Sequence, residues 1–230
     1  MKKTVLITGA SGNLGSATVQ IMLNQQYRVV ASGNKAGKPA FMEQLENIEY
    51  HQVNLSMEED ASNFVAAAIE RYGAIDAGLL LAGGFDMGTL GSSDQKALKR
   101  MFEINFETAY NTARPLFSHM MKQGYGRIVF VGARAAHLAA QGKHMIGYAL
   151  SKSLLFRLSE YLNEEAKGFN VVSSVIVPST IDTPQNRESM PDADTNKWVK
   201  PEEIAELLGF ICSDKAAALR EPVYKIYNNS

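Results

Sequence analysis

Tyr148 and Lys152 carry the clearest chemical signal in the sequence, because they stand four residues apart in Tyr148-Ala149-Leu150-Ser151-Lys152. In a helix this spacing places the phenol and the ammonium group on one face. A phenol has a pKa of about 10, and an adjacent ammonium group favours the phenolate and lowers that pKa. The pair is therefore suited to general acid/base catalysis near neutral pH. Taken alone, the same spacing is more often found on a surface helix, so the interpretation depends on the other motifs.

Three glycines at intervals of three residues form a second signal, in Thr8-Gly9-Ala10-Ser11-Gly12-Asn13-Leu14-Gly15. They follow an apolar segment and open an amphipathic one, so they mark a turn between a strand and a helix. Glycines let a phosphate approach the backbone, and a helix N-terminus favours an anion. The spacing differs from the common Gly-x-Gly-x-x-Gly fingerprint, but it still predicts binding of a dinucleotide pyrophosphate.

The residue that ends the second strand of such folds selects the nicotinamide cofactor, since a carboxylate there binds the ribose hydroxyls of NAD. This sequence has Ser32-Gly33-Asn34-Lys35, which contains no carboxylate. Asn34, together with Lys35 or Lys38, is suited to a ribose 2′-phosphate. The sequence therefore favours NADP(H), with NAD(H) as the alternative; ordinary solvated surface charge is the other reading of the two lysines.

Short apolar, β-branched segments alternate with amphipathic segments along the chain. The expected strands are Thr4–Thr8, Arg28–Ser32, Glu49–Val53, Gly78–Leu81, Arg127–Val131, Val171–Val177 and Val223–Tyr227. The expected helices are Leu14–Gln26, Ala61–Tyr72, Gln95–Gln123, Gly147–Lys167 and Pro201–Ser213. The strands lack polar alternation, which is typical of a parallel sheet covered on both faces. We expect one doubly wound α/β (Rossmann) domain over residues 1–230, with a seven-stranded parallel sheet flanked by helices.

The longest stretch without a strand or helix pattern is Pro178–Lys200, which contains three prolines and several Asp, Asn and Ser residues. Its position after the sixth strand places it at the carboxyl edge of the sheet, where ligands bind in such folds. A loop of this length in a compact domain is usually functional or disordered. The sequence therefore predicts an irregular loop that acts as a substrate lid.

Composition excludes several classes of protein. The chain has 230 residues, of which 46% are apolar and 20% charged, so it is neither disordered nor fibrous. Its net charge of −1 provides no overall field that would recruit nucleic acid or anionic lipid. No run of 18 apolar residues predicts a membrane span, and the apolar run near the N-terminus is too short for a signal peptide.

The cysteine and histidine content bears on the cellular compartment of the protein and on whether it binds a metal. Cys212 is the only cysteine, so an internal disulfide and a cysteine-based zinc site are excluded and a reducing compartment is favoured. The four histidines show no i, i+4 pair and no companion cysteines, so no metal is expected. We expect a cytoplasmic protein.

With these motifs in place, the whole chain resembles the short-chain dehydrogenase/reductase family. The resemblance extends through Leu81-Ala82-Gly83-Gly84, Asn105 and Pro178-Ser179-Thr180-Ile181-Asp182-Thr183. It implies that Tyr148 is the general acid/base, that Lys152 holds the nicotinamide ribose and tunes the tyrosine, and that Asn105 anchors a proton-relay water. A helix-capping or helix-bending residue is the other interpretation of Asn105. The cofactor contacts implied by the motifs are Gly9, Ser11, Gly12, Asn13, Leu14, Gly15, Asn34, Lys35, Asn54, Ala82, Gly83, Lys152, Pro178 and Thr183.

Two departures from the family pattern point to one branch of it. The usual catalytic serine corresponds to Ala133, and the common Asn-Asn-Ala-Gly reads Leu80-Leu81-Ala82-Gly83. The dihydropteridine reductase branch shares the alanine and the glycine spacing, and it is similar to this chain over residues 182–194. That branch normally uses NADH with an aspartate where Asn34 stands, and an asparagine at position 105 is not expected in it.

The resemblance implies an NAD(P)H-dependent reductase of small molecules, and the missing serine favours a pre-activated acceptor such as quinonoid dihydropterin over a simple ketone. A carbonyl or quinone reductase in which Arg134 or a backbone N–H replaces the serine is one alternative. A dinucleotide sensor without catalysis is another, which the intact Tyr148 and Lys152 oppose. The family resemblance also implies a homodimer or homotetramer built on the long helices before and after the fifth strand.

Overall fold

The apolar segments form one parallel β-sheet, seen in the computed structural model, which describes residues 2–220 and 223–229. Within these residues seven strands pair in the order β3-β2-β1-β4-β5-β6-β7, and every neighbouring pair is parallel. They are β1 (Thr4–Thr8), β2 (Arg28–Gly33), β3 (Ile48–Gln52), β4 (Ala77–Leu80), β5 (Tyr125–Val131), β6 (Asn170–Pro178) and β7 (Val223–Ile226). The expected single Rossmann domain with a seven-stranded parallel sheet is confirmed.

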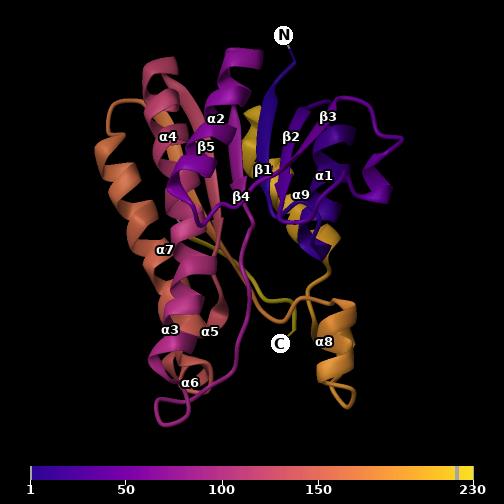
Figure 1. Ribbon diagram of the computed structural model, residues 1–230, viewed down its shortest axis with the longest axis vertical. Helices are drawn as coiled ribbons and strands as arrows, with labels where there is room; N and C mark the ends of the chain where they lie inside the picture. Colours follow the sequence, from indigo (N-terminus) through magenta and orange to yellow (C-terminus); the bar gives the residue numbers. More distant parts are fainter. Residues whose placement is uncertain (1, 221–222, 230) are drawn as a thin grey trace.

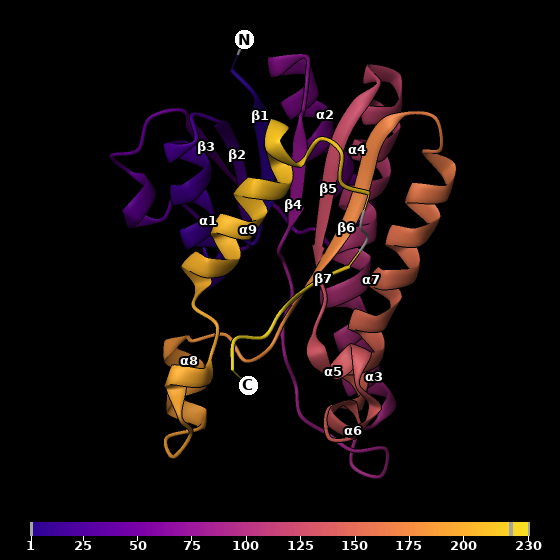
Figure 2. The same ribbon diagram turned by 180° about the vertical axis from the view of Figure 1, so that it is seen from behind.

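Helices cover both faces of this sheet (Figures 1 and 2). Two of them, α1 and α9, pack side by side on one face, and α2, α4 and α7 cover the other. The long helices are α1 (Asn13–Asn24), α2 (Glu58–Tyr72), α4 (Thr108–Gln123), α7 (Ile146–Glu165) and α9 (Pro201–Cys212). The short ones are α3 (Gln95–Phe102), α5 (Arg134–His137), α6 (Ala139–Gly142) and α8 (Pro184–Ser189).

Two apolar cores hold these layers together, one on each face of the sheet. Successive side chains of β1 point to opposite faces. Val5 and Ile7 pack with Val19 of α1, whereas Leu6 packs on the other side with Leu116 of α4. All three β1 side chains are fully buried. The absence of polar alternation in the strand sequences therefore reflects burial of both faces.

The carboxyl edge of the sheet contains the switch point of the topology, between β1 and β4. On one side of this point the chain proceeds from β1 to β2 and β3, and on the other side from β4 to β5, β6 and β7. In doubly wound folds such a reversal of strand order opens a crevice at the carboxyl ends of the strands. In Figure 1 the helices below this edge form two groups, with α8 on one side and α3, α5 and α6 on the other. The fold therefore presents the glycine turn, the loop after β4 and the predicted lid at one edge.

The segment Gln95–Gln123 is not the single regular helix that the sequence predicts. It begins as α3, passes through a π-helical turn at Glu103–Glu107 and continues as α4. A π turn inserts one extra residue into a continuous helix. Because the segment contains no proline or glycine at this point, the sequence predicts one uninterrupted regular helix. Turns of the π type often occur at functional sites, and this one contains Asn105.

The segment Pro178–Lys200 was expected to be irregular throughout, and this is wrong for part of it. Residues Pro184–Ser189 form α8, which has a proline in its first turn. The Oγ1 atom of Thr183 accepts a hydrogen bond from the backbone N–H of Asn186 at 3.2 Å and caps this helix. A Thr-Pro start is a regular helix signal, but with only six residues the helix is too short to show apolar periodicity.

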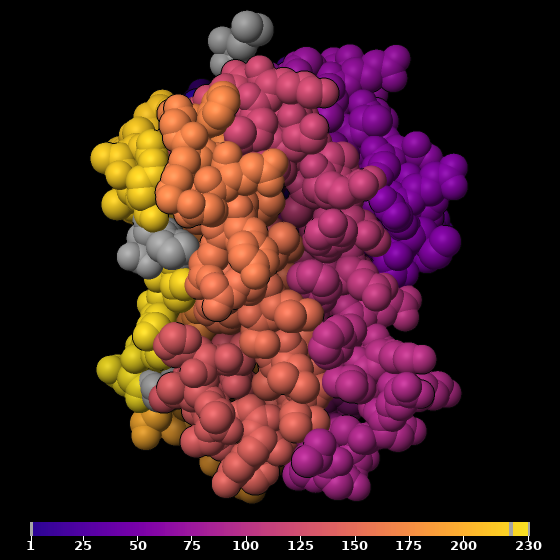
Figure 3. Space-filling model, turned by 90° about the vertical axis from the view of Figure 1, so that its left-hand side faces the viewer, coloured from indigo at the N-terminus to yellow at the C-terminus, as the bar shows by residue number. Residues whose placement is uncertain are grey.

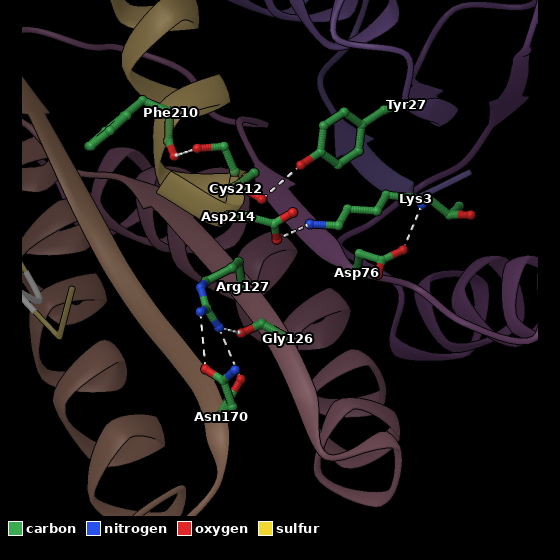
Figure 4. A network of polar contacts seen from close by, with 11 residues as sticks. Lys3, Tyr27, Asp76, Gly126, Arg127, Asn170, Phe210, Cys212 and Asp214 are labelled. Carbon is green, nitrogen blue, oxygen red and sulfur yellow. Dashed lines mark hydrogen bonds and ion pairs between the residues drawn. The ribbon is translucent and has the colours of Figure 1, made fainter. Parts of the chain in front are cut away.

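Polar contacts connect neighbouring elements at the opposite, amino-terminal edge of the sheet (Figure 4). The Tyr27 hydroxyl donates to the carbonyl oxygen of Cys212 at 2.7 Å, which ties β2 to the end of α9. The buried guanidinium group of Arg127 donates to the carbonyl oxygen of Asn170 at 2.9 Å, which ties β5 to β6. These contacts lie at the end of the sheet away from the glycine turn, so they serve the fold rather than the site.

Cys212 is expected to be chemically inert in the folded protein. Its side chain is 2% exposed, and burial raises the pKa of its thiol to about 12. Because the thiolate is the reactive form, an aromatic disulfide reagent at pH 8 should label the native chain only as fast as it unfolds. The measurement is labelling followed by absorbance with and without denaturant. Fast labelling of the native protein at a rate unaffected by mild denaturant would contradict this prediction.

Candidate functional site

The glycine turn joins β1 to α1 and packs against the loop that follows β4. Gly9 has a φ of +64°, a conformation that L side chains rarely adopt. A Cβ atom on Gly9 would lie 2.9 Å from the Cα atom of Ala82, and one on Gly15 would lie 2.2 Å from the carbonyl oxygen of Gly9. Both positions therefore need glycine, and the turn holds the N-terminus of α1 close to the end of β4.

The first turn of α1 lies at the carboxyl edge of the sheet. Gly12 is the N-cap residue, and in the described part of the chain no side chain caps this helix. The turn itself is closed by the N–H group of Gly12, which donates to the carbonyl oxygen of Gly9 at 3.0 Å. Uncapped N–H groups at the start of a twelve-residue helix suit an anion. The close-packed glycine cradle therefore fits a dinucleotide pyrophosphate.

Tyr148 and Lys152 lie in the first two turns of α7, at the carboxyl edge of β5. The ammonium group of Lys152 is buried and donates to the carbonyl oxygen of Val131 at 2.9 Å. The ring of Tyr148 meets the exposed ring of Phe85 edge to face, with 5.0 Å between the ring centroids. The helix thus places the two groups on one side, and Phe85 lies beside them.

The pKa expected for Tyr148 from the sequence is wrong for this structure. Burial raises the pKa of the Tyr148 phenol to about 12, and burial lowers the pKa of Lys152 to about 8. In both cases removal from water disfavours the charged form. The phenol therefore stays protonated at neutral pH, which suits a proton donor.

Asn105 is fully buried in the π-helical turn and joins the loop after β4 to α7. Its Oδ1 atom accepts a hydrogen bond from the N–H group of Gly84 at 3.0 Å. Its Nδ2 atom donates to the Oγ atom of Ser151 at 3.2 Å. Ser151 in turn donates to the carbonyl oxygen of Tyr148 at 2.8 Å. These bonds make Asn105 the link between the glycine-containing loop and the Tyr148 helix.

Gly83 packs against Asn105 and Lys152, and its replacement by alanine tests how tightly this cluster of Asn105, Lys152 and Tyr148 is packed. A Cβ atom there would lie 2.6 Å from Oδ1 of Asn105 and 3.0 Å from Nζ of Lys152. Because both neighbours are buried and hydrogen-bonded, Gly83→Ala should displace them and reduce turnover by roughly a hundredfold, the cost of a misplaced catalytic group. Steady-state kinetics measures the effect.

Gly91→Ala is the matched control for this variant, since a Cβ atom on Gly91 has no heavy atom within 4 Å. It should leave turnover within about twofold, as surface substitutions generally do. Equal rates for the two alanine variants would show that the cluster tolerates displacement and would contradict the packing argument.

Ala133, which the sequence resemblance aligns with the catalytic serine, is 5% exposed and directly precedes α5. Its side chain supplies no hydrogen-bond donor. The neighbouring Arg134, considered from the sequence as a replacement donor, lies with its guanidinium carbon 4.8 Å from the ring centroid of Tyr227. In this structure the Arg134 side chain therefore stacks on the C-terminal segment.

The other predicted cofactor residues lie along the same edge of the sheet. Asn34 and Lys35 follow β2 and are exposed. The exposed Asn54 lies beyond β3, and its Oδ1 atom accepts a hydrogen bond from Oγ of Ser56 at 2.9 Å. Pro178 ends β6, and Thr183 caps α8. The structure thus brings the predicted cofactor residues to one edge, with Asn34 and Lys35 at its outer end.

One contact that the sequence does not reveal joins the glycine turn to the predicted lid. The Nδ2 atom of Asn13 donates to the Oε1 atom of Gln185 in α8 at 2.8 Å. Within α8, the guanidinium group of Arg187 forms two hydrogen bonds with the carboxylate of Asp182, at 2.6 and 2.8 Å. Sequence reasoning also misses Phe85 and Ser151. A Tyr-x-x-Ser-Lys spacing places Ser151 one residue before the lysine, whereas nothing in the sequence marks Phe85 or Gln185.

A comparison with known families decides the affiliation. The model of a family described as short chain dehydrogenase matches residues 3–194. The chain belongs to the short-chain dehydrogenase family. It is an NAD(P)-dependent oxidoreductase of this family, and the expectation drawn from the motifs is confirmed.

Two reductases are among the proteins that are similar to this short-chain dehydrogenase in sequence. The chain is 29% identical to a dihydropteridine reductase of Dictyostelium discoideum, over 90% of this chain and 87% of the relative. It is 23% identical to a 3-oxoacyl-[acyl-carrier-protein] reductase of Thermotoga maritima, over 94% of this chain and 92% of the relative.

Solved structures agree on the fold of this short-chain dehydrogenase. The structure of gox2181 matches with a TM-score of 0.88 at 18% identity, over 98% of this chain and 94% of that one. ElxO with NADP bound matches with a TM-score of 0.86 at 19% identity, over 98% and 97% of the two chains. At these identities the likeness concerns the fold alone.

No helix within residues 2–220 and 223–229 is long and apolar enough to cross a membrane. No group of three or more His, Cys, Asp or Glu side chains comes together there in a way that would hold a metal ion.

Proposed function

We propose that this enzyme is an NADP(H)-preferring reductase of a conjugated, pre-activated acceptor such as quinonoid dihydropterin, with Tyr148 as the proton donor. The observation that carries the proposal is the presence of Ala133 at the serine position beside an intact cluster of Tyr148, Lys152 and Asn105. The similarity to a dihydropteridine reductase over 90% of the chain supports the choice of acceptor.

The proposed cofactor site runs along the carboxyl edge of the sheet. The pyrophosphate is assigned to the N–H groups at the start of α1, within Gly9–Gly15, and the adenosine end to Asn34, Lys35 and Asn54. The nicotinamide end is assigned to the residues around the Tyr148 cluster: Ala82, Gly83, Lys152, Pro178 and Thr183. When bound, the reduced nicotinamide supplies the hydride. The chain's own groups bind it, orient it and provide the proton.

The proton step rests on the burial of Tyr148. Its phenol is protonated at neutral pH because burial raises its pKa to about 12. It therefore enters the reduction as a proton donor. The charge of Lys152 stabilises the phenolate left behind. Asn105 acts as a positioning residue, because its amide holds Gly84 and, through Ser151, the start of α7.

The missing serine bears on the acceptor. A hydrogen-bond donor to a developing oxyanion is worth about 3 kcal/mol, or roughly a hundredfold in rate. A simple ketone needs such a donor, whereas a conjugated imine has its acceptor system already activated. Because the Ala133 side chain carries no donor, the site is better suited to the conjugated acceptor.

We also propose that residues 178–200 act as the substrate lid. The segment connects β6 to α9, and α8 within it contacts the glycine turn through the hydrogen bond between Asn13 and Gln185. The ion pair between Asp182 and Arg187 stiffens the start of this segment. A lid that contacts the pyrophosphate turn couples cofactor binding to closure over the acceptor.

The experiment that tests this function is the oxidation of NADPH and NADH by the purified protein with quinonoid dihydropterin, beside a panel of simple ketones and quinones. Pterin turnover that is faster with NADPH supports the proposal. Turnover of ketones or quinones without pterin turnover replaces it with a carbonyl or quinone reductase. Tighter binding of NADH than of NADPH overturns the cofactor preference. Binding of either cofactor with no acceptor reduced favours the sensor alternative.

The proposed assembly is a homodimer or homotetramer in the cytoplasm. The outer face of α4 and α7, turned toward the viewer in Figure 3, has a groove of about 560 Å³ lined by Tyr110, Phe117, Met121 and Leu158. The groove sits between the two long helices that the family resemblance assigns to subunit contact. A cytoplasmic location agrees with a lone, buried Cys212. Sedimentation of the wild type and of Tyr161→Asp, which introduces a charge into the lining of this groove, tests the assembly.

A further inference from the structure

Gly33, the last residue of β2, borders a small space that two hydroxyl groups share. A Cβ atom on Gly33 would lie 2.5 Å from the hydroxyl oxygen of Tyr50 and 3.0 Å from the Oγ atom of Ser11. Ser11 belongs to the glycine turn and Tyr50 to β3, so the two hydroxyls come from opposite sides of the end of β2. The absence of a side chain at Gly33 leaves room for them to approach each other.

The phenol of Tyr50 is held in this position from both ends. Its ring packs against the core on the α1 face of the sheet. Its hydroxyl group donates to the carbonyl oxygen of Lys35 at 3.0 Å. A half-buried ring therefore carries its oxygen to the point where the chain leaves β2, next to Asn34 and Lys35.

The chemistry of this corner matches a phosphate better than a pair of ribose hydroxyls. In dinucleotide-binding folds the end of the second strand lies beside the ribose of the adenosine, and a carboxylate there accepts from the ribose hydroxyls. Residues 32–38 contain no carboxylate here. The hydroxyls of Ser11 and Tyr50 border Gly33 instead, and Asn34 and Lys35 follow it directly in the chain. These side chains can donate hydrogen bonds or carry positive charge.

We propose that Tyr50 is a specificity-determining residue, whose phenol donates a hydrogen bond to the phosphate on the 2′-oxygen of the adenosine ribose, together with Ser11. This inference rests on the proposed preference for NADP(H). It adds to the cofactor site a residue of β3, which lies outside both the glycine turn and the end of β2. To donate to the phosphate, the phenol would give up its hydrogen bond to the carbonyl oxygen of Lys35. A ribose without the phosphate lacks the anionic acceptor, so the Tyr50 hydroxyl contributes less to its binding.

The test uses Tyr50→Phe, which keeps the packed ring and removes only the hydroxyl group. Calorimetric titration with adenosine 2′,5′-bisphosphate and with adenosine 5′-monophosphate reports binding at this corner without any turnover. The expected result is about a tenfold loss of affinity for the bisphosphate, the usual effect of one hydrogen bond to a charged group, with the monophosphate within twofold. NADPH and NADH should show the same difference. Tyr125→Phe, at the opposite end of the sheet, should change neither affinity.

The outcomes separate this inference from the proposed function. If the wild type prefers the bisphosphate and Tyr50→Phe keeps that preference, the role of Tyr50 is overturned and the NADP(H) preference stands. If the variant loses affinity equally for both nucleotides, Tyr50 supports the fold of the corner and the inference is also overturned. If the wild type itself shows no preference for the bisphosphate, both the inference and the NADP(H) preference fail, whereas the reductase activity remains to be judged by turnover.

Discussion

Replacement of Tyr148 by phenylalanine is expected to lower the turnover of the best acceptor by 10²- to 10⁴-fold, the usual contribution of a general acid. The ring of phenylalanine fills the same space beside Phe85, so the edge-to-face contact at 5.0 Å is retained. The change removes one hydroxyl group that is protonated at neutral pH. Steady-state kinetics with reduced cofactor measures the loss, and titration of the same cofactor should give a dissociation constant within about threefold of the wild type.

Tyr125→Phe is the control for this variant, because Tyr125 begins β5 at the opposite end of the sheet and the substitution again removes only a hydroxyl group. It should leave turnover within twofold. If Tyr148→Phe retains turnover within about tenfold of the wild type, the proton comes from another group and the assignment of Tyr148 fails. If both cofactor binding and turnover disappear, Tyr148 shapes the cofactor site.

Patterns that repeat along the chain predict the framework of the site well. The strands and the glycine turn depend on burial of both sheet faces and on close backbone contacts, and each leaves a regular pattern in residues that are neighbours in the sequence. Val5, Leu6 and Ile7 are all buried because β1 is covered on both sides, and Gly9 and Gly15 are needed because a Cβ atom would meet backbone atoms. These parts of the structure follow from local sequence.

The parts that sequence did not predict arise from tertiary contacts. The π-helical turn at Glu103–Glu107 lies inside a continuous helical segment, and only the hydrogen bonds of Asn105 to Gly84 and Ser151 reveal its use. The pKa of Tyr148 follows from the burial of its phenol, which spacing to a lysine does not encode. Tyr50 becomes relevant only because β3 lies beside β2 and Gly33 has no side chain.

Replacement of Lys152 by methionine is expected to lower turnover by at least about a hundredfold, since it removes a positive charge that stabilises the phenolate. The same change is expected to stabilise the fold. Burial lowers the pKa of Lys152 to about 8, whereas an unfolded lysine titrates near 10.5. Keeping this buried ammonium group protonated at neutral pH therefore costs the folded state roughly 3 kcal/mol. The methionine variant avoids this cost but also loses the hydrogen bond to the carbonyl oxygen of Val131, which offsets about 1 kcal/mol of the gain in stability.

The net gain of about 2 kcal/mol should raise the Tm of Lys152→Met by roughly 4 to 8 °C at pH 7 for a chain of this size. Lys167→Met is the control, because Lys167 is exposed and its ion pair with Glu164 contributes little. Equal or lower stability of Lys152→Met at pH 7 would show that the buried ammonium group is stabilised by its surroundings.

The pH dependence of this difference identifies its cause. Below about pH 8 both the folded and the unfolded wild type carry the proton on Lys152, and the folded state bears the full cost. Between pH 8 and 10.5 the unfolded chain binds this proton and the folded chain does not, so the stability of the wild type rises relative to that of the methionine variant. The Tm difference should therefore shrink over this range, as differential scanning calorimetry at several pH values will show. A difference that stays constant from pH 7 to 10.5 would assign the stabilisation to apolar packing of methionine, and the ammonium group would then be kept without cost to the fold.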